Sequence, residues 1–92
     1  MKMQRPDLGS TVYYVRYVWA KDYAHAEYEV RRCLYAANYA GPPFELLLRF
    51  PDGSAVWVHE SVLGRQVFTD PDEAQAVADK WTRRLWESWR TL

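Results

Sequence analysis

The sequence is poor in cysteine and glycine, contains no isoleucine and has no long apolar segment. Because Cys33 is the single cysteine, the chain cannot form an internal disulfide bond, which agrees with a reducing compartment. No apolar run approaches the ~20 residues of a membrane-spanning helix, and no signal-peptide core follows the first residues. These absences predict a cytoplasmic protein without membrane contact.

The four glycines are dispersed along the chain, so they form no loop that could hold a phosphate group. We therefore expect no nucleotide and no other cofactor. The 12 Lys and Arg residues balance the 12 Asp and Glu residues, which argues against a strongly basic nucleic-acid binder. A length of 92 residues allows one domain. We place it at residues 11–92, after a flexible N-terminal lead at residues 1–10.

Aromatic residues are abundant, with five Trp, seven Tyr and three Phe. They must supply the core volume that isoleucine would normally fill. Residues 11–19 are β-branched and aromatic and predict a strand. The next segment, from Asp22 to about residue 40, predicts a helix that Asp22 caps and Gly41 ends. Its expected core stripe consists of Tyr23, Ala26, Val30, Cys33, Leu34 and Ala37.

Two alternating segments, residues 44–50 and 55–59, predict a β-hairpin around a turn at residues 51–53. In the expected register, Leu46, Leu48, Val56 and Val58 share one face, and Trp57 and His59 point the other way. Within residues 62–69 the pattern is ambiguous, because Gly64 interrupts it, but residues 66–69 could add a short strand.

The C-terminal segment begins with Asp70, Pro71 and Glu73, which form a helix-capping pattern before apolar residues at helical spacing. The segment VFTDPDEAQAVADKW resembles the strand and capped helix that end many small α+β accessory domains. The predicted fold is therefore a small single-domain α+β sandwich of order β-α-β-β-(β)-α. Its antiparallel-rich sheet carries both helices on one face.

Candidate metal ligands have ordinary structural explanations. His25 and Glu29 are four residues apart on the predicted helix, but no further ligand lies at suitable spacing. Asp70, Asp72 and Glu73 form an acidic cluster that helix capping explains. We expect no metal site.

Candidate catalytic residues are equally sparse. His59, Glu60 and Ser61 offer a base, a carboxylate and a hydroxyl, but neighbouring residues of a strand point to opposite faces, so we expect no preassembled triad. Cys33 is expected to be a buried, unreactive thiol. The sequence therefore predicts a protein that is not an enzyme, with a small enzyme built around His59 as a remote alternative.

The predicted surfaces carry more aromatic residues than a solvent-facing helix or sheet normally does. On the first helix, Tyr28, Arg32, Tyr35 and Tyr39 project opposite the core stripe, with Arg31 at the margin. Trp86 is a second exposed candidate on the C-terminal helix. The sheet face away from both helices would present Val12, Tyr14, Arg16, Val18, Leu47, Arg49, Trp57 and His59. That face is too apolar to remain in contact with water unless a terminal segment covers it.

We therefore expect a non-enzymatic protein-binding module whose partner is a protein, with a homodimer as one form of that contact. Its small size and surface aromatics are similar in general character to phage or mobile-element inhibitors of host machines, anti-CRISPR proteins among them. No motif carries that likeness. The alternative is a single-stranded nucleic-acid binder that stacks bases on Tyr14 and Trp57 and holds phosphates with Arg16 and Arg49. Zero net charge makes nucleic acid the weaker choice.

Overall fold

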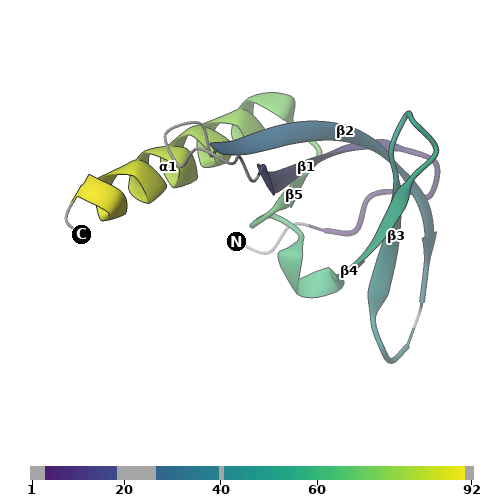
Figure 1. Ribbon diagram of the computed structural model, residues 1–92. Helices are drawn as coiled ribbons and strands as arrows, with labels where there is room; N and C mark the ends of the chain where they lie inside the picture. The colour runs from purple at the N-terminus through teal and green to yellow at the C-terminus, as the bar shows by residue number, and fades with distance from the viewer. Residues whose placement is uncertain (1–3, 19–26, 40, 91–92) are drawn as a thin grey trace.

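The computed structural model describes residues 4–18, 27–39 and 41–90. Its elements are strands β1 (Thr11–Val18), β2 (Glu27–Asn38), β3 (Glu45–Arg49) and β4 (Ala55–His59), the 3₁₀ helix η2 (Glu60–Val62), strand β5 (Val67–Phe68) and helix α1 (Pro71–Arg90). The strands form one five-stranded sheet in the order β4-β3-β2-β1-β5, and each neighbouring pair is antiparallel (Figure 1). The α+β class is confirmed.

The helix expected at residues 22–40 is wrong, because residues 27–38 form strand β2. Residues 27–34 of this strand pair with the whole of β1, so tertiary pairing overrides the helical spacing of the apolar residues. The expected cap at Asp22 lies outside the described residues. Within the described chain there is one α-helix, so neither the β-α-β order nor the layer of two helices is present.

Strand β2 serves two partners along its length. Its first part pairs with β1, and residues 34–38 also pair with β3. The register shifts between Tyr35 and Ala37, a β-bulge of the kind that increases local twist. The sheet accordingly curls, with β3 and β4 turned down from the plane of β1 and β2 (Figure 1). This curvature gives the sheet an inner face and an outer face.

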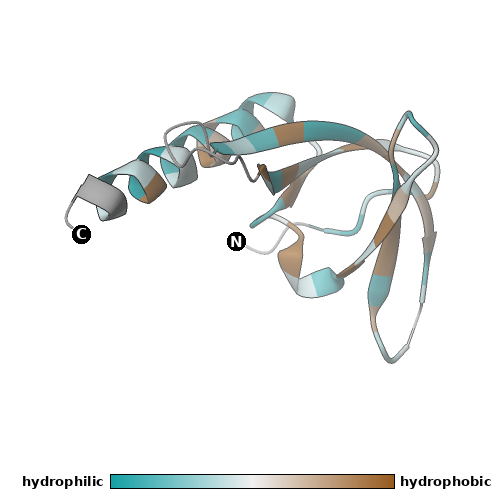
Figure 2. Ribbon diagram, viewed as in Figure 1, coloured by the Kyte–Doolittle hydropathy of each residue, from teal (hydrophilic) through white to brown (hydrophobic). Residues whose placement is uncertain are grey.

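The inner face encloses the larger hydrophobic core. Strand β3 and the segment after η2 carry much of it and are brown in Figure 2. The buried members are Val12, Cys33, Tyr35, Leu46, Leu48, Phe50, Val58, Leu63 and Val67. Residues from the first strand, the hairpin and the segment after η2 therefore share one core.

The open sheet face expected from the sequence does not exist in that form. Val12 is fully buried and Tyr14 packs against the inner core, whereas Leu47 and Trp57 lie on the outer face. The sequence placed the two groups on one face because it treated residues 27–38 as a helical crossover between β1 and β3. As a strand, β2 joins β1 to β3 directly and sets which of their residues share a face.

The outer face is covered at one end by α1. Ala74 and Ala78 are fully buried in a second core cluster with Val15 and Phe68. The helix begins as the sequence predicts, since the amide N–H of Asp72 donates to Asp70 Oδ1 at 2.9 Å. The predicted start of the C-terminal helix is thus confirmed, and Ala74 and Ala78 are among its apolar residues at helical spacing.

The hairpin is also confirmed. Gly53 has φ of 90°, and Asp52 Oδ1 accepts hydrogen bonds from the Ser54 amide at 2.9 Å and the Ser54 hydroxyl at 2.6 Å. These hydrogen bonds lower the pKa of the Asp52 carboxyl. The pairs Leu46 with Val58 and Leu48 with Val56 match the expected register. The short strand expected at residues 66–69 is present as β5.

The opposite orientation of two adjacent leucines on β3 gives a direct test of this register. Leu46 is fully buried in the inner core, whereas Leu47 lies on the outer face. Leu46→Ala should therefore lower the free energy of unfolding by about 2–5 kcal/mol, the usual range for a core leucine. Leu47→Ala should cost clearly less in the same urea titration. Equal losses would contradict the register.

Candidate binding surface

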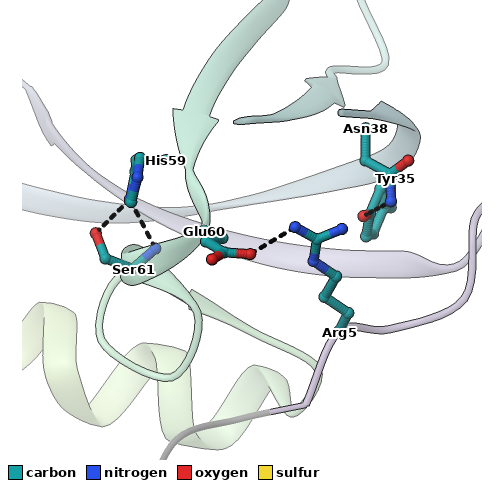
Figure 3. A network of polar contacts seen from close by, with 6 residues as sticks. All are labelled: Arg5, Tyr35, Asn38, His59, Glu60 and Ser61. Atoms are coloured by element: carbon teal, nitrogen blue, oxygen red, sulfur yellow. Dashed lines mark hydrogen bonds and ion pairs between the residues drawn. The ribbon is translucent and has the colours of Figure 1, made fainter. Parts of the chain in front are cut away.

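The Tyr and Arg residues predicted to form a helical stripe are divided between two faces. On β2, Tyr28 and Arg32 point to the outer face, whereas Arg31 and Tyr35 point to the inner face. Tyr35 is only 1% exposed, and its hydroxyl accepts a hydrogen bond from Asn38 Nδ2 at 2.8 Å (Figure 3). The single stripe is therefore wrong, because a strand alternates its side chains.

Apolar side chains on the outer face beyond α1 are exposed or only half-buried. We call this region the outer aromatic surface; it consists of Leu34, Ala37, Tyr39, Leu47 and Trp57. The rings of Tyr39 and Trp57 are stacked, with centroids 5.1 Å apart and an interplanar angle of 28°. Leu34, Tyr39 and Trp57 are 43%, 49% and 43% exposed. The sequence singled out two of these residues but placed Leu34 in a helical core.

Strand β4 forms one end of the sheet, and within the described residues it pairs only with β3. The amide of Glu60 donates to the carbonyl of Phe44 at 2.9 Å, and the amide of Phe50 donates to the carbonyl of Ser54 at 2.8 Å. Because bonding alternates along an antiparallel pair, the backbone N–H and C=O of Trp57 point away from β3. No other described strand pairs with β4 on that side. Trp57 is therefore 43% exposed, and its backbone N–H and C=O meet no other strand in the part of the chain that the structure describes.

Two arginines stand over a buried ring on the inner side of the sheet. The guanidinium carbons of Arg16 and Arg31 lie 5.8 and 5.6 Å from the centre of the Phe50 ring, and Tyr14 packs 6.2 Å from it. Arg16 also donates to Glu29 Oε1 at 2.6 Å. The sequence named Tyr14, Arg16 and Arg31 but not Phe50, whose place in the alternation of residues 44–50 was the available signal.

Two further arginines lie on the outer face beside the aromatic surface. Arg32 and Arg49 are exposed and line a groove of about 470 Å³ together with Thr11, Leu34 and Pro51. Neither guanidinium forms an ion pair within the part of the chain that the structure describes. The groove therefore has a positive lining that no described carboxylate neutralises.

A third group of aromatic residues lies where α1 meets the start of β2. Tyr28 packs edge-on against Trp81 with ring centres 5.3 Å apart, and its backbone N–H donates to Thr82 Oγ1 at 2.9 Å. Trp86 is 43% exposed and lines a pocket with Tyr28, Thr82 and Arg83. Trp86 thus lies on α1 beside Tyr28 of β2, whereas Trp57 lies on β4 at the end of the sheet. The structure does not bring the two predicted tryptophans together.

The His59, Glu60 and Ser61 group forms a helix cap and a separate ion pair (Figure 3). His59 Nδ1 accepts from the Ser61 amide at 3.1 Å and lies 2.9 Å from the Ser61 hydroxyl. Glu60 pairs with Arg5 instead of orienting the imidazole. Among the described residues no carboxylate bonds to His59 Nε2, so the contact is not arranged as a catalytic triad.

The remaining candidate ligands are held by other contacts or lie outside the described residues. Glu29 is paired with Arg16, and its suggested partner His25 is not among the residues described. In residues 4–18, 27–39 and 41–90, no three His, Cys, Asp or Glu side chains gather as a metal site would require. Likewise, no helix in these ranges is long and apolar enough to span a bilayer.

Comparison with protein-family models, curated proteins and solved structures gives no match. Function must therefore be argued from the geometry of this chain.

The buried thiol yields a prediction that involves only one cysteine. Cys33 is 3% exposed, and burial raises the pKa of its thiol from 9.0 to about 11. At pH 8 the folded protein should react with a thiol reagent about a hundredfold more slowly than the urea-unfolded protein, because the thiolate is scarce and shielded. Because the pKa of the thiol is higher in the folded than in the unfolded protein, folding is favoured by the neutral thiol. The free energy of unfolding should therefore be unaffected by Cys33 below pH 9 and should fall as the pH rises from 9 towards 11. Equal reaction rates in both states would contradict the burial.

Proposed function

We propose that this protein is a non-enzymatic protein-binding module that contacts its partner through the outer aromatic surface. The stacked and half-exposed pair of Tyr39 and Trp57 carries the proposal. Tyrosine and tryptophan are the residues that most often dominate the binding energy of protein interfaces. Because the rings already hold each other in place, binding would immobilise few additional side-chain rotamers.

The surroundings of the pair favour a protein partner. Leu34, Ala37 and Leu47 give the surface an apolar centre, and Arg32 and Arg49 lie at its margin. An apolar centre with a charged rim is the usual anatomy of a protein interface. The unpaired edge of β4 adds backbone donors and acceptors beside Trp57. Self-association and the blocking of a host machine's surface are two forms that this binding could take.

Nucleic-acid binding is less well supported, because its four proposed residues lie on different faces. Tyr14 and Arg16 belong to the inner side, where Arg16 is neutralised by Glu29, whereas Arg49 and Trp57 lie outside. One strand of nucleic acid could not use all four together. The chain's net charge of zero adds no attraction for a polyanion.

A pair of equally exposed tryptophans gives a matched test. Trp57 and Trp86 are both 43% exposed but lie on different elements, β4 and α1. In quantitative capture from the native cell, Trp57→Ala should lose the proteins that the wild type retains, and Trp86→Ala should keep them. The free energy of unfolding of Trp57→Ala should fall only modestly, by the ~0.5–1.5 kcal/mol of an aromatic pair plus limited burial.

Capture by Trp57→Ala at the wild-type yield would contradict the proposed surface. If the captured protein is a second copy of the chain, sedimentation equilibrium at micromolar concentrations should give a dimer for the wild type and a monomer for Trp57→Ala.

The nucleic-acid alternative has its own test. A fluorescently labelled, mixed-sequence single strand should show no binding below ~10 μM at physiological salt, since a chain of zero net charge has no broad basic field to attract a polyanion. Submicromolar binding that collapses between 50 and 200 mM salt, roughly as counterion release requires, and that also disappears in Trp57→Ala would favour nucleic acid over protein.

A further inference from the structure

Part of β2 has an unpaired edge between its two structural partners. The amide of Tyr35 donates to the carbonyl of Ser10 at 3.0 Å, on the β1 side. Because a strand alternates the direction of its backbone groups, Cys33 also faces β1, whereas Val30 and Arg32 face the opposite side. On that opposite side β3 pairs with β2 only from Leu34 onward. The N–H and C=O groups of Val30 and Arg32 therefore meet no described strand.

Both ends of this open stretch are fixed. At one end the hairpin turns away from β2 after Arg49, through Phe50 and Pro51. At the other end the N–H of Tyr28 is already bonded to Thr82 Oγ1 of α1 at 2.9 Å. The distance from Tyr28 to Leu34 is about 20 Å for strand residues that each advance about 3.3 Å. A short extended segment of about five residues fits this length.

The side chains beside the open stretch are basic on both faces of the sheet. Arg32 projects to the outer face near Arg49, and both line the groove of about 470 Å³ at the point where β3 leaves β2. Arg31 projects to the inner face, where its guanidinium carbon lies 5.6 Å from the centre of the Phe50 ring. The nearby carboxylate of Glu29 is bound by Arg16. None of Arg31, Arg32 and Arg49 has an ion-pair partner among the described side chains.

We propose that this open stretch of β2 binds an extended acidic segment of a partner protein as an added strand. The segment residue opposite Arg32 would place its side chain on the outer face, within reach of Arg32 and Arg49. The next residue would face Arg31 on the inner side, because an added strand alternates its side chains in register with β2. Carboxylates at successive positions would therefore meet a guanidinium on each face.

This inference rests on the proposed protein-binding function and names the kind of segment that the partner supplies. In strand addition, backbone groups of the partner segment pair with the N–H and C=O groups of Val30 and Arg32. The arginines beside this edge then give specificity for acidic side chains. A second copy of the chain is a poor source, because its acidic group at Asp70, Asp72 and Glu73 belongs to the start of α1. A free phosphate or a nucleic acid would use the arginines but not the backbone edge.

The test uses the full-length ¹⁵N-labelled protein and a capped seven-residue peptide of valine and glutamate with adjacent glutamates at its centre. Bound peptide should slow hydrogen exchange of the Val30 and Arg32 amides by about tenfold or more. The Cys33 amide, which already faces β1, should be unaffected. A peptide of the same sequence with alternate backbone nitrogens methylated keeps its charge but cannot pair, so it should not bind.

Variants separate the open stretch from the outer aromatic surface. Arg32→Glu and Arg49→Glu should each weaken peptide affinity by about tenfold, whereas Arg65→Glu should leave it unchanged. Arg65 is the matched control, since it is exposed and lies beside Gln66, whose carbonyl bonds to the other edge of β1. Trp57→Ala should bind the peptide normally, so failure of the proposed outer surface would not affect this result.

Two outcomes would overturn the proposal. One is an unchanged exchange rate at Val30 and Arg32 with millimolar peptide present. The other is equal binding of the methylated peptide, which would mean that the arginines attract anions without strand addition.

Discussion

The backbone hydrogen bonds of β2 are the interaction on which the other parts of this protein depend. This one strand bonds to β1 along its first part and to β3 along its last part, and the two contacts overlap at Leu34. The bulge after Tyr35 turns the second contact away from the plane of the first. The curled sheet, the enclosed inner core and the position of the hairpin all follow from this division.

The same division creates the surfaces available for binding. Because β3 and β4 curl away from α1, the helix covers only part of the outer face, and Leu34, Leu47 and Trp57 lie beyond it. Because β3 leaves β2 after Arg49, the backbone at Val30 and Arg32 is unpaired within the described chain. An aromatic surface and an arginine-lined strand edge thus arise beside each other from one change of partner. A single protein could contact both.

Segments with strong local signals could be predicted from the sequence. Asp70 and Pro71 specify a helix start whatever the rest of the chain does, and the turn around Gly53 requires the left-handed backbone that glycine adopts readily. Alternation then fixed the orientation of Trp57 relative to Val58. The exposure of the Trp57 ring therefore follows from the strand pattern, whereas its stacking on Tyr39 does not.

The helix prediction for residues 27–38 is wrong because their apolar residues satisfy two periods. Val30, Leu34 and Ala37 have helical spacing, whereas Cys33 and Tyr35 have strand spacing, and local propensity does not choose between them. The hairpin, the C-terminal helix and the alternation within each strand are encoded locally, since they depend on neighbouring residues. Long-range pairing was needed to make β2 a strand and to set which faces of β1 and β3 coincide. Those features depend on backbone hydrogen bonds to residues far along the chain, which no local pattern records.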